Sequence, residues 1–461
     1  MLALMDEELE KILRGARADP ADGELLEQAI GRLRRAEERV PADLLDRVVH
    51  PPRSFKSQRS FKVVCELPDG TYQELGETPG ELAIPAHRHW WVTPQPVKLT
   101  KPLVAELVEA EVPGLTFGRS RSVTKLIDKL AALPHLSFLS FESTKTDDET
   151  LAALPAFPRL AQLSLSGTKI TSLQELPAKT PELVRLNLDN ARKAKDLAAL
   201  ADLPNLRRLA ASRGPLGLKV LKGLPVLPEL THLGLYGCPF TGKMVEAARR
   251  CFPGLVELSV DTKTVLEGPI LEEVAGFEGL LALSLRSNEL LQPPGVDLTP
   301  LLKLSRLRYL SLGWDTLLDS SQLLELTQLT HFVSTDADDV LCEQLARLPR
   351  LRRVTLSGRT GLTAAGFASL AQSPTLEQID LTGWAYTNDE GNYVPVSEEE
   401  FQRALEALQG SAVRTLRRNQ SAYLLDPAEP LVVEVPQPRG IVVPPETPPA
   451  WRPCGPWAIL P

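Results

Sequence analysis

The sequence has few cysteines, no long apolar run and no apparent secretion signal, and each of these shortages excludes a class of protein. Its five cysteines, spread over 461 residues, show no paired spacing, which argues against a disulfide framework. No run of about 18 apolar residues occurs, so no membrane-spanning helix is predicted. The apolar run at the N-terminus is too short for a signal peptide. We therefore expect a cytoplasmic protein with reduced thiols.

The chain also has fewer basic than acidic residues, and it has few aromatic residues. The chain has 51 lysines and arginines against 59 acidic residues, which gives a net charge of −8. Phosphate backbones and anionic lipid surfaces attract basic proteins, so we expect neither a nucleic-acid partner nor a membrane partner. Hydrophobic residues make up 43% of the chain, yet only 5% of it is aromatic. Leucine is the most frequent of the hydrophobic residues, and this bias suggests one small unit that is used many times.

A leucine pattern recurs along the middle of the chain. The motif Leu-x-x-Leu-x-Leu, with conservative replacements, begins at Leu136, Leu160, Leu183, Leu206, Leu230, Leu255, Leu280, Leu307, Leu329, Leu351 and Leu376. Each copy alternates like a short strand and is followed by apolar residues at helical spacing. Such a strand and helix cannot bury their apolar faces alone, so neighbouring units must stack. The pattern predicts a solenoid of parallel strands backed by short helices.

These motifs resemble those of bacterial leucine-rich-repeat proteins, and the helices make the chain similar to ribonuclease-inhibitor-like horseshoes. The resemblance covers roughly residues 113–420. It implies an α/β leucine-rich-repeat solenoid with strands on the concave face and helices on the convex face. The sequence departs from the family at the asparagine after the strand, where Gly167, Gly237 and Gly358 stand, with Asn190 and Asn288 as partial matches.

The two ends of the chain differ from the repeats. We predict four parts: an N-terminal helical segment at 1–50, a small β-containing cap at 51–112, the leucine-rich-repeat solenoid at 113–420 and a proline-rich C-terminal tail at 421–461. The cap is indicated by clean alternation over residues 61–67, before a Pro-Asp-Gly turn. The tail has eleven prolines between Pro427 and Pro461, which favours extended, polyproline-like chain.

Two segments contain residue types that are used in catalysis or metal binding. Gly237–Lys243 has the G-x-x-x-x-G-K spacing of a phosphate-binding loop, but Met244 stands where a hydroxyl would hold magnesium. His87 and His89 lack paired ligand spacing, so we interpret them as part of a packed cap. We predict no enzyme, no cofactor and no metal site. A nucleotide-dependent enzyme that uses the Gly237–Lys243 loop is kept as an alternative.

The predicted solenoid favours a binding surface. The third, fifth and seventh residues of each unit point away from the core and form the concave face. The fifth positions are mostly small and make a trough, whereas the third positions carry larger groups. Two clusters on this face are candidate partner-binding residues. The first is a basic strip of Arg185, Arg208 and His232 with Arg213 and Tyr236, and the second consists of Tyr309, Trp314, His331, Arg353 and Arg286.

The second cluster is the preferred site, because tyrosine, tryptophan and arginine are enriched at binding hot spots. We therefore predict a non-enzymatic scaffold or adaptor for protein-protein interaction, which binds a protein partner on the concave face. An inhibitory or regulatory subunit of a partner enzyme is the alternative that the same architecture permits.

Overall fold

The computed structural model describes residues 49–67, 72–95, 99–117, 123, 126–238, 241–262, 268–287, 297–312, 319–334, 337–358, 361–387, 393–418 and 421–424. The helices predicted within residues 1–50 lie outside this range, as does the proline-rich tail beyond residue 424. The chain divides into two compact units, with the boundary between Pro215 and Leu216. We call the described residues before this boundary unit 1 and those after it unit 2.

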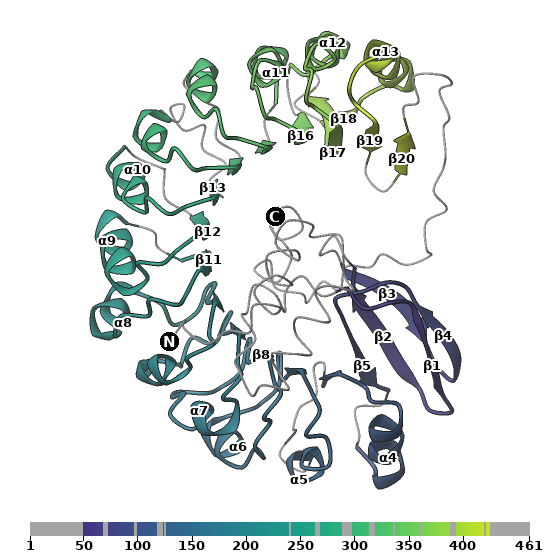
Figure 1. Ribbon diagram of the computed structural model, residues 1–461, viewed down its shortest axis with the longest axis vertical. Helices are drawn as coiled ribbons and strands as arrows, with labels where there is room; N and C mark the ends of the chain where they lie inside the picture. The colour runs from purple at the N-terminus through teal and green to yellow at the C-terminus, as the bar shows by residue number, and fades with distance from the viewer. Residues whose placement is uncertain are drawn as a thin grey trace, which may run out of the picture. The chain divides into compact units, whose positions relative to one another are not determined.

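Unit 1 begins with strands that pair mainly antiparallel (Figure 1). They are β1 (Arg53–Ser57), β2 (Phe61–Glu66), β3 (Tyr72–Glu77), β4 (Gly80–Ile84) and β5 (His89–Pro94). Strand β1 pairs with β4, and β2 pairs with both β3 and β5. Phe61, Val63 and Cys65 of β2 are buried, as the alternation predicts, but Val64 and Glu66 on the opposite face are buried as well. Because β5 also pairs in parallel with β6, the sheet of this region continues into the repeats.

The repeats of unit 1 each contain one short strand and one short helix. Their elements are α4 (Lys101–Glu109), β6 (Gly114–Thr116), α5 (Ile127–Leu130), β7 (Phe138–Ser140), α6 (Asp148–Ala152), β8 (Gln162–Ser164), α7 (Leu176–Lys179), β9 (Arg185–Asn187), the 3-10 helix η2 (Ala198–Asp202) and β10 (Arg208–Ala210). Strands β6 to β10 pair in parallel and in chain order. This register aligns equivalent leucines of successive repeats, such as Leu139 and Leu163, and both are buried.

Unit 2 continues the same alternation. Its elements are α8 (Leu218–Gly223), β11 (His232–Tyr236), α9 (Gly242–Cys251), β12 (Glu257–Thr262), α10 (Gly268–Ala275), β13 (Ala282–Ser287), η3 (Thr299–Lys303), β14 (Tyr309–Leu312), η4 (Ser320–Glu325), β15 (His331–Ser334), α11 (Asp339–Ala346), β16 (Arg353–Gly358), α12 (Ala364–Leu370), β17 (Gln378–Thr387), β18 (Tyr393–Pro395), α13 (Glu398–Leu408), β19 (Thr415–Arg418) and β20 (Ser421–Leu424). Strands β11 to β17 pair in parallel, followed by β19. Strand β20 then pairs antiparallel with β19.

Both units are leucine-rich-repeat arrays, so the fold class predicted from the sequence is confirmed. Within each unit the helices lie on one side of the strands (Figure 1), and the leucines of the motif are buried between the two layers. None of the helices among the described residues is long and apolar enough to cross a membrane. The division of the chain into four parts stays a prediction.

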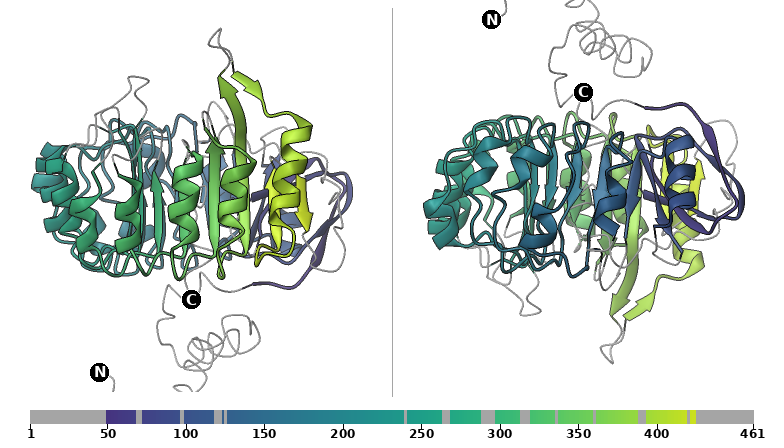
Figure 2. Two further views of the ribbon diagram at one scale, coloured as in Figure 1. Left: turned by 90° about the horizontal axis from the view of Figure 1, so that it is seen from above. Right: turned by 90° about the horizontal axis from the view of Figure 1, so that it is seen from below.

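One irregularity interrupts the repeats of unit 2. Strand β17 is 10 residues long, and its outer half pairs antiparallel with β18. The resulting two-stranded ribbon extends beyond the neighbouring strands (Figure 2). The leucine motif gives no sign of this ribbon, because its residues lie after the last position that the motif defines.

The turn after the strand has the same backbone conformation in five repeats. The φ angles are 56° at Ser143, 64° at Gly167, 57° at Asn190, 47° at Arg213 and 61° at Gly237. Glycine and asparagine tolerate this left-handed region best, which explains why they recur there. In two repeats the next residue is a buried threonine. Thr144 and Thr168 donate hydrogen bonds to the carbonyls of Phe141 and Leu165, at 2.7 and 2.6 Å, and thereby hold the turn.

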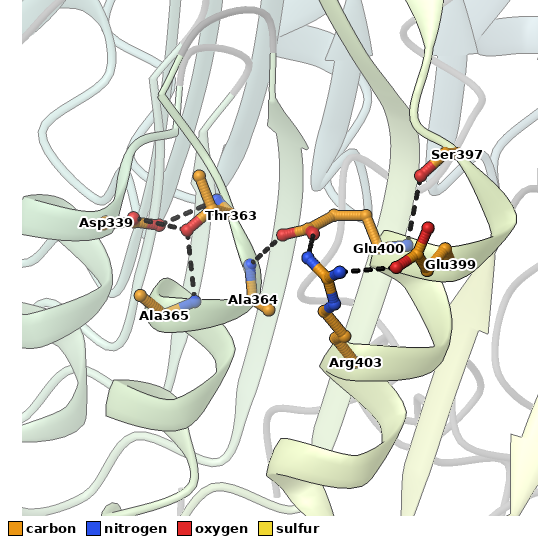
Figure 3. A network of polar contacts seen from close by, with 8 residues as sticks. All are labelled: Asp339, Thr363, Ala364, Ala365, Ser397, Glu399, Glu400 and Arg403. Carbon is orange, nitrogen blue, oxygen red and sulfur yellow. Dashed lines mark hydrogen bonds and ion pairs between the residues drawn. The ribbon is translucent and has the colours of Figure 1, made fainter.

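Side-chain oxygens join the helices of neighbouring repeats at their N-terminal ends (Figure 3). Asp339 of α11 accepts hydrogen bonds from the backbone and hydroxyl of Thr363, at 2.8 and 2.7 Å. Glu400 of α13 accepts one from the backbone of Ala364 at 2.7 Å. The first N–H groups of a helix have no partner inside the helix. These contacts therefore satisfy exposed helix ends and fix the spacing of the repeats.

Candidate partner-binding site

The second predicted cluster lies on consecutive strands of unit 2. Tyr309 of β14 is in register with His331 of β15, which is in register with Arg353 of β16. Tyr309 and His331 are both buried, whereas Arg353 is partly exposed. The three residues thus form one continuous row, but Arg353 is the member that a partner can reach most easily.

Asp380 of β17 fixes the position of the Arg353 side chain. The Nε of Arg353 donates to Oδ2 of Asp380 at 2.6 Å, and Gln378 donates to Oδ1 of the same carboxylate at 2.9 Å. The Nε of Arg417, on β19, lies 3.9 Å from Oδ1. Two guanidinium groups therefore face one buried carboxylate. The cluster carries one net positive charge and presents it in a defined geometry.

Asp380, Gln378 and Arg417 were not among the residues singled out from the sequence. The sequence does contain a sign of this contact. Asp380 is the one acidic residue at the fifth position of a repeat, and its repeat directly follows one with arginine at the third position. Opposite charges on neighbouring strands of a parallel sheet lie within reach of each other. A search for such pairs would have found this contact.

His331 adds no charge to the cluster at neutral pH. Its burial, together with the positive charges of Arg353 and Arg352, lowers the pKa of the imidazole to about 4. The Nδ1 atom of the ring lies 2.9 Å from the hydroxyl of Thr330. The positive charge of the row therefore comes from its arginines.

The other two members of the second cluster are Trp314 and Arg286. Trp314 lies outside the described residues. Arg286 is on β13, where it is in register with Asp261 of β12. Tyr309 faces Ala282 of β13 instead. Arg286 therefore occupies the seventh-position row and not the row of Tyr309.

The first predicted cluster is divided between the units. Arg185 and Arg208 are in register on β9 and β10 of unit 1, whereas His232 and Tyr236 lie on β11 of unit 2. Arg185 is also not a free cation, because its Nη1 lies 3.7 Å from Oε2 of Glu66 and both side chains are buried. Glu66 belongs to β2, more than one hundred residues earlier. The leucine motif could not reveal this pair.

Unit 1 contains a further buried carboxylate, that of Asp189. Asp189 follows β9 and accepts a hydrogen bond from the backbone of Ser212 at 2.5 Å. Its own backbone donates to Oδ1 of Asn187 at 2.8 Å. Burial raises the pKa of Asp189 to about 7, against the opposing effect of the Ser212 hydrogen bonds and the Arg213 charge. Burial therefore favours the protonated form of this carboxyl group.

The two ends of the Gly237–Lys243 segment lie in a repeat turn and in the first turn of helix α9. Gly237 has the left-handed φ of 61° that the other turns show. Thr241 caps α9, and Lys243 is exposed in its first turn. Met244, at the position where a phosphate-binding loop carries its magnesium ligand, is buried in the core. The segment thus has a sufficient structural explanation. Among the described residues, no group of three or more His, Cys, Asp or Glu residues could hold a metal ion.

Solved structures that resemble this chain share little sequence with it. No family model and no curated protein matches the sequence. Similar solved structures include an internalin of Listeria monocytogenes, which is 16% identical over 68% of this chain and 88% of its own, with a TM-score of 0.39. A leucine-rich-repeat protein of Leptospira interrogans is 19% identical over 70% of this chain and 76% of its own, with a TM-score of 0.36. TLR13, solved with single-stranded RNA, is 17% identical over 70% of this chain and 53% of its own, with a TM-score of 0.39.

Proposed function

We propose that this protein is a binding scaffold that holds a protein partner on the strands β15 to β19 of unit 2. The observation that carries this proposal is the fixed arginine pair at Asp380. Arg353 is held at 2.6 Å from the carboxylate, while part of its side chain stays exposed. A side chain that is already ordered loses less conformational entropy when a partner binds.

The surroundings of the arginine pair are suited to protein contact. Val333, Thr355, Gln378 and Thr415, on the same face of these strands, are all partly exposed. By contrast, the fifth-position serines of β12 to β14 are buried. We name the exposed set, together with Arg353 and Arg417, the open face. It combines a small-residue floor with two cations, and cations at protein interfaces usually meet acidic groups of the partner.

The open face therefore favours an acidic partner segment. Together with Asp380, the open face carries a net charge of plus one, and this charge is local, since the whole chain carries a net charge of −8. A partner carboxylate could share the two guanidinium groups with Asp380, because arginine offers five N–H donors in a planar fork. Binding of this kind weakens as the salt concentration rises.

The test is affinity capture from the native host's lysate with quantitative mass spectrometry. It compares the wild-type chain with the Arg353→Ala/Arg417→Ala variant. The matched control is Arg347→Ala/Arg350→Ala, which removes the same charge from exposed positions outside the strands. We expect a partner whose recovery drops at least about tenfold in the open-face variant, since hot-spot arginines contribute more than 1 kcal/mol. The control should keep that partner.

Two results would count against the proposal. If the same partners are recovered equally by both variants, the binding surface lies elsewhere on the chain. If no partner is lost even at low salt, the open face does not bind protein. Once a partner is known, its activity with and without this chain will distinguish a passive scaffold from an inhibitory subunit.

A further inference from the structure

Three aromatic side chains form a row on the sheet of unit 1. The ring centroids of Tyr72 and Trp91 lie 5.5 Å apart, and those of Trp91 and Phe138 lie 5.1 Å apart. All three residues are half-buried, whereas their chain neighbours Trp90 and Leu139 are buried in the core. Since successive side chains of a strand point to opposite faces, the row lies on the face opposite the core. We call these three residues the aromatic row.

Gly114 makes this row possible. It lies on β6, between the strands that carry Trp91 and Phe138. A Cβ atom at Gly114 would come within 2.6 Å of Cβ of Trp91 and 3.0 Å of Cδ1 of Phe138. Glycine weakens a strand, and in strands it often marks a place where other groups approach closely. Here it allows two rings from non-adjacent strands to meet and form a continuous apolar surface.

The surroundings of the row are positively charged. The charges that act on the Tyr72 hydroxyl are those of Glu66, Arg185, Arg208 and Arg88, which are three positive groups and one negative group. Glu66 and Arg185 form the buried pair described above. An occupant of the aromatic row would therefore combine rigid apolar groups with negative charge.

We propose that the aromatic row binds the proline-rich tail of the same chain, residues 425–461. Proline-rich segments in the polyproline conformation dock against aromatic side chains, at a low cost in conformational entropy. The tail contains the spacing Pro-x-x-Pro three times, beginning at Pro427, Pro445 and Pro453. It also carries four acidic residues against two arginines, which complements the charge beside the row. Its 37 residues after Leu424 would span roughly 115 Å in this conformation.

The first test places a photo-crosslinking residue, benzoylphenylalanine, at Tyr72 of the full-length chain. We expect an intramolecular crosslink to a peptide within residues 425–461, identified by mass spectrometry. The same residue at Val226, which is 49% exposed in unit 2, is the control and should not capture the tail. Crosslinks from Tyr72 only to a second copy of the chain, or only to other peptides, would overturn the proposal.

The second test measures trypsin cleavage after Arg439, within the tail. If the tail is bound, the Trp91→Ala/Phe138→Ala variant should be cleaved there at least about tenfold faster, because cleavage follows the population of the released state. The Val226→Ala/Val340→Ala variant, which changes exposed residues of unit 2, should be cleaved like the wild type. Equal rates in all three proteins would contradict the proposal. Should the first variant unfold, judged by circular dichroism, Tyr72→Ser at the edge of the row replaces it.

Discussion

Unit 1 and unit 2 each place an arginine from the third position of a repeat next to a carboxylate, but the two pairs differ in their contact with water. In unit 1, Arg185 and Glu66 lie 3.7 Å apart, with side chains that are 7% and 5% exposed. In unit 2, Arg353 and Asp380 lie 2.6 Å apart, with side chains that are 32% and 11% exposed. The same position of the same repeat thus holds a buried ion pair in one unit and a reachable cation in the other.

The difference shows how a uniform repeat can serve two purposes. Removing two charges from water costs several kcal/mol per ion, and a buried pair recovers this only while both partners are present. A partly exposed pair keeps much of its hydration and contributes little to stability. We therefore expect changes in unit 1 to alter folding and changes in unit 2 to alter binding.

The largest expected effect concerns Asp189 of unit 1. Because its folded pKa, about 7, lies above the ordinary value of an aspartate, the folded state holds a proton that the unfolded state releases. The contribution of Asp189 to stability should therefore fall as the pH rises from about 4 to about 7, by up to about 4 kcal/mol, and stay low above that range. The lowered pKa of His331 gives a slope of the opposite sign, so the Asp189 contribution is obtained as the difference between the wild type and Asp189→Asn, which lacks it. Urea unfolding at pH 5 and pH 8 measures it.

The control for this prediction is Asp202→Asn, at an exposed position of η2. This variant should keep the pH dependence of the wild type. An Asp189→Asn variant with the same pH dependence as the wild type would show that the buried carboxyl group relaxes or is hydrated.

The next largest effect is expected for Arg185→Met. It leaves Glu66 buried without its Arg185 contact, which should cost roughly 3 kcal/mol of unfolding free energy. The double variant Glu66→Gln/Arg185→Met removes both charges and should recover most of this loss. Urea denaturation of the four proteins in this cycle measures the coupling between the two residues. If the double variant is as unstable as the single one, the effect comes from packing and not from charge.

The smallest effect on stability is expected for Arg353→Met in unit 2. Its ion pair with Asp380 is partly exposed, so the loss should be at most about 1 kcal/mol. The same substitution should nevertheless reduce capture of the partner proposed above. Urea denaturation and affinity capture on one protein sample make this comparison. A large loss of stability would instead assign the pair in unit 2 the same structural role as the pair in unit 1.

The repeat motif predicts much of the fold because its leucines mark the buried positions directly. Counting from Leu307, Leu329 and Leu351 places Tyr309, His331 and Arg353 at equivalent positions, and the strand register aligns them. The contacts that distinguish these residues are harder to predict. Asp380 is one repeat away from Arg353, whereas Glu66 comes from a strand outside the motif. A periodic pattern gives the row on which a residue lies, but not its partner across the sheet.

The sequence by itself determined the repeat length, the alternation of strand and helix and the residues that line each row, because burying leucines at a fixed period permits few other arrangements. It also placed glycine or asparagine at three of these turns, where a left-handed φ favours them, although Ser143 and Arg213 adopt the same conformation. Only the tertiary structure decided which charges are buried, which rings meet over Gly114 and which arginine stays exposed. These outcomes depend on the contacts and the hydration of each side chain, and residues far apart in the chain set both.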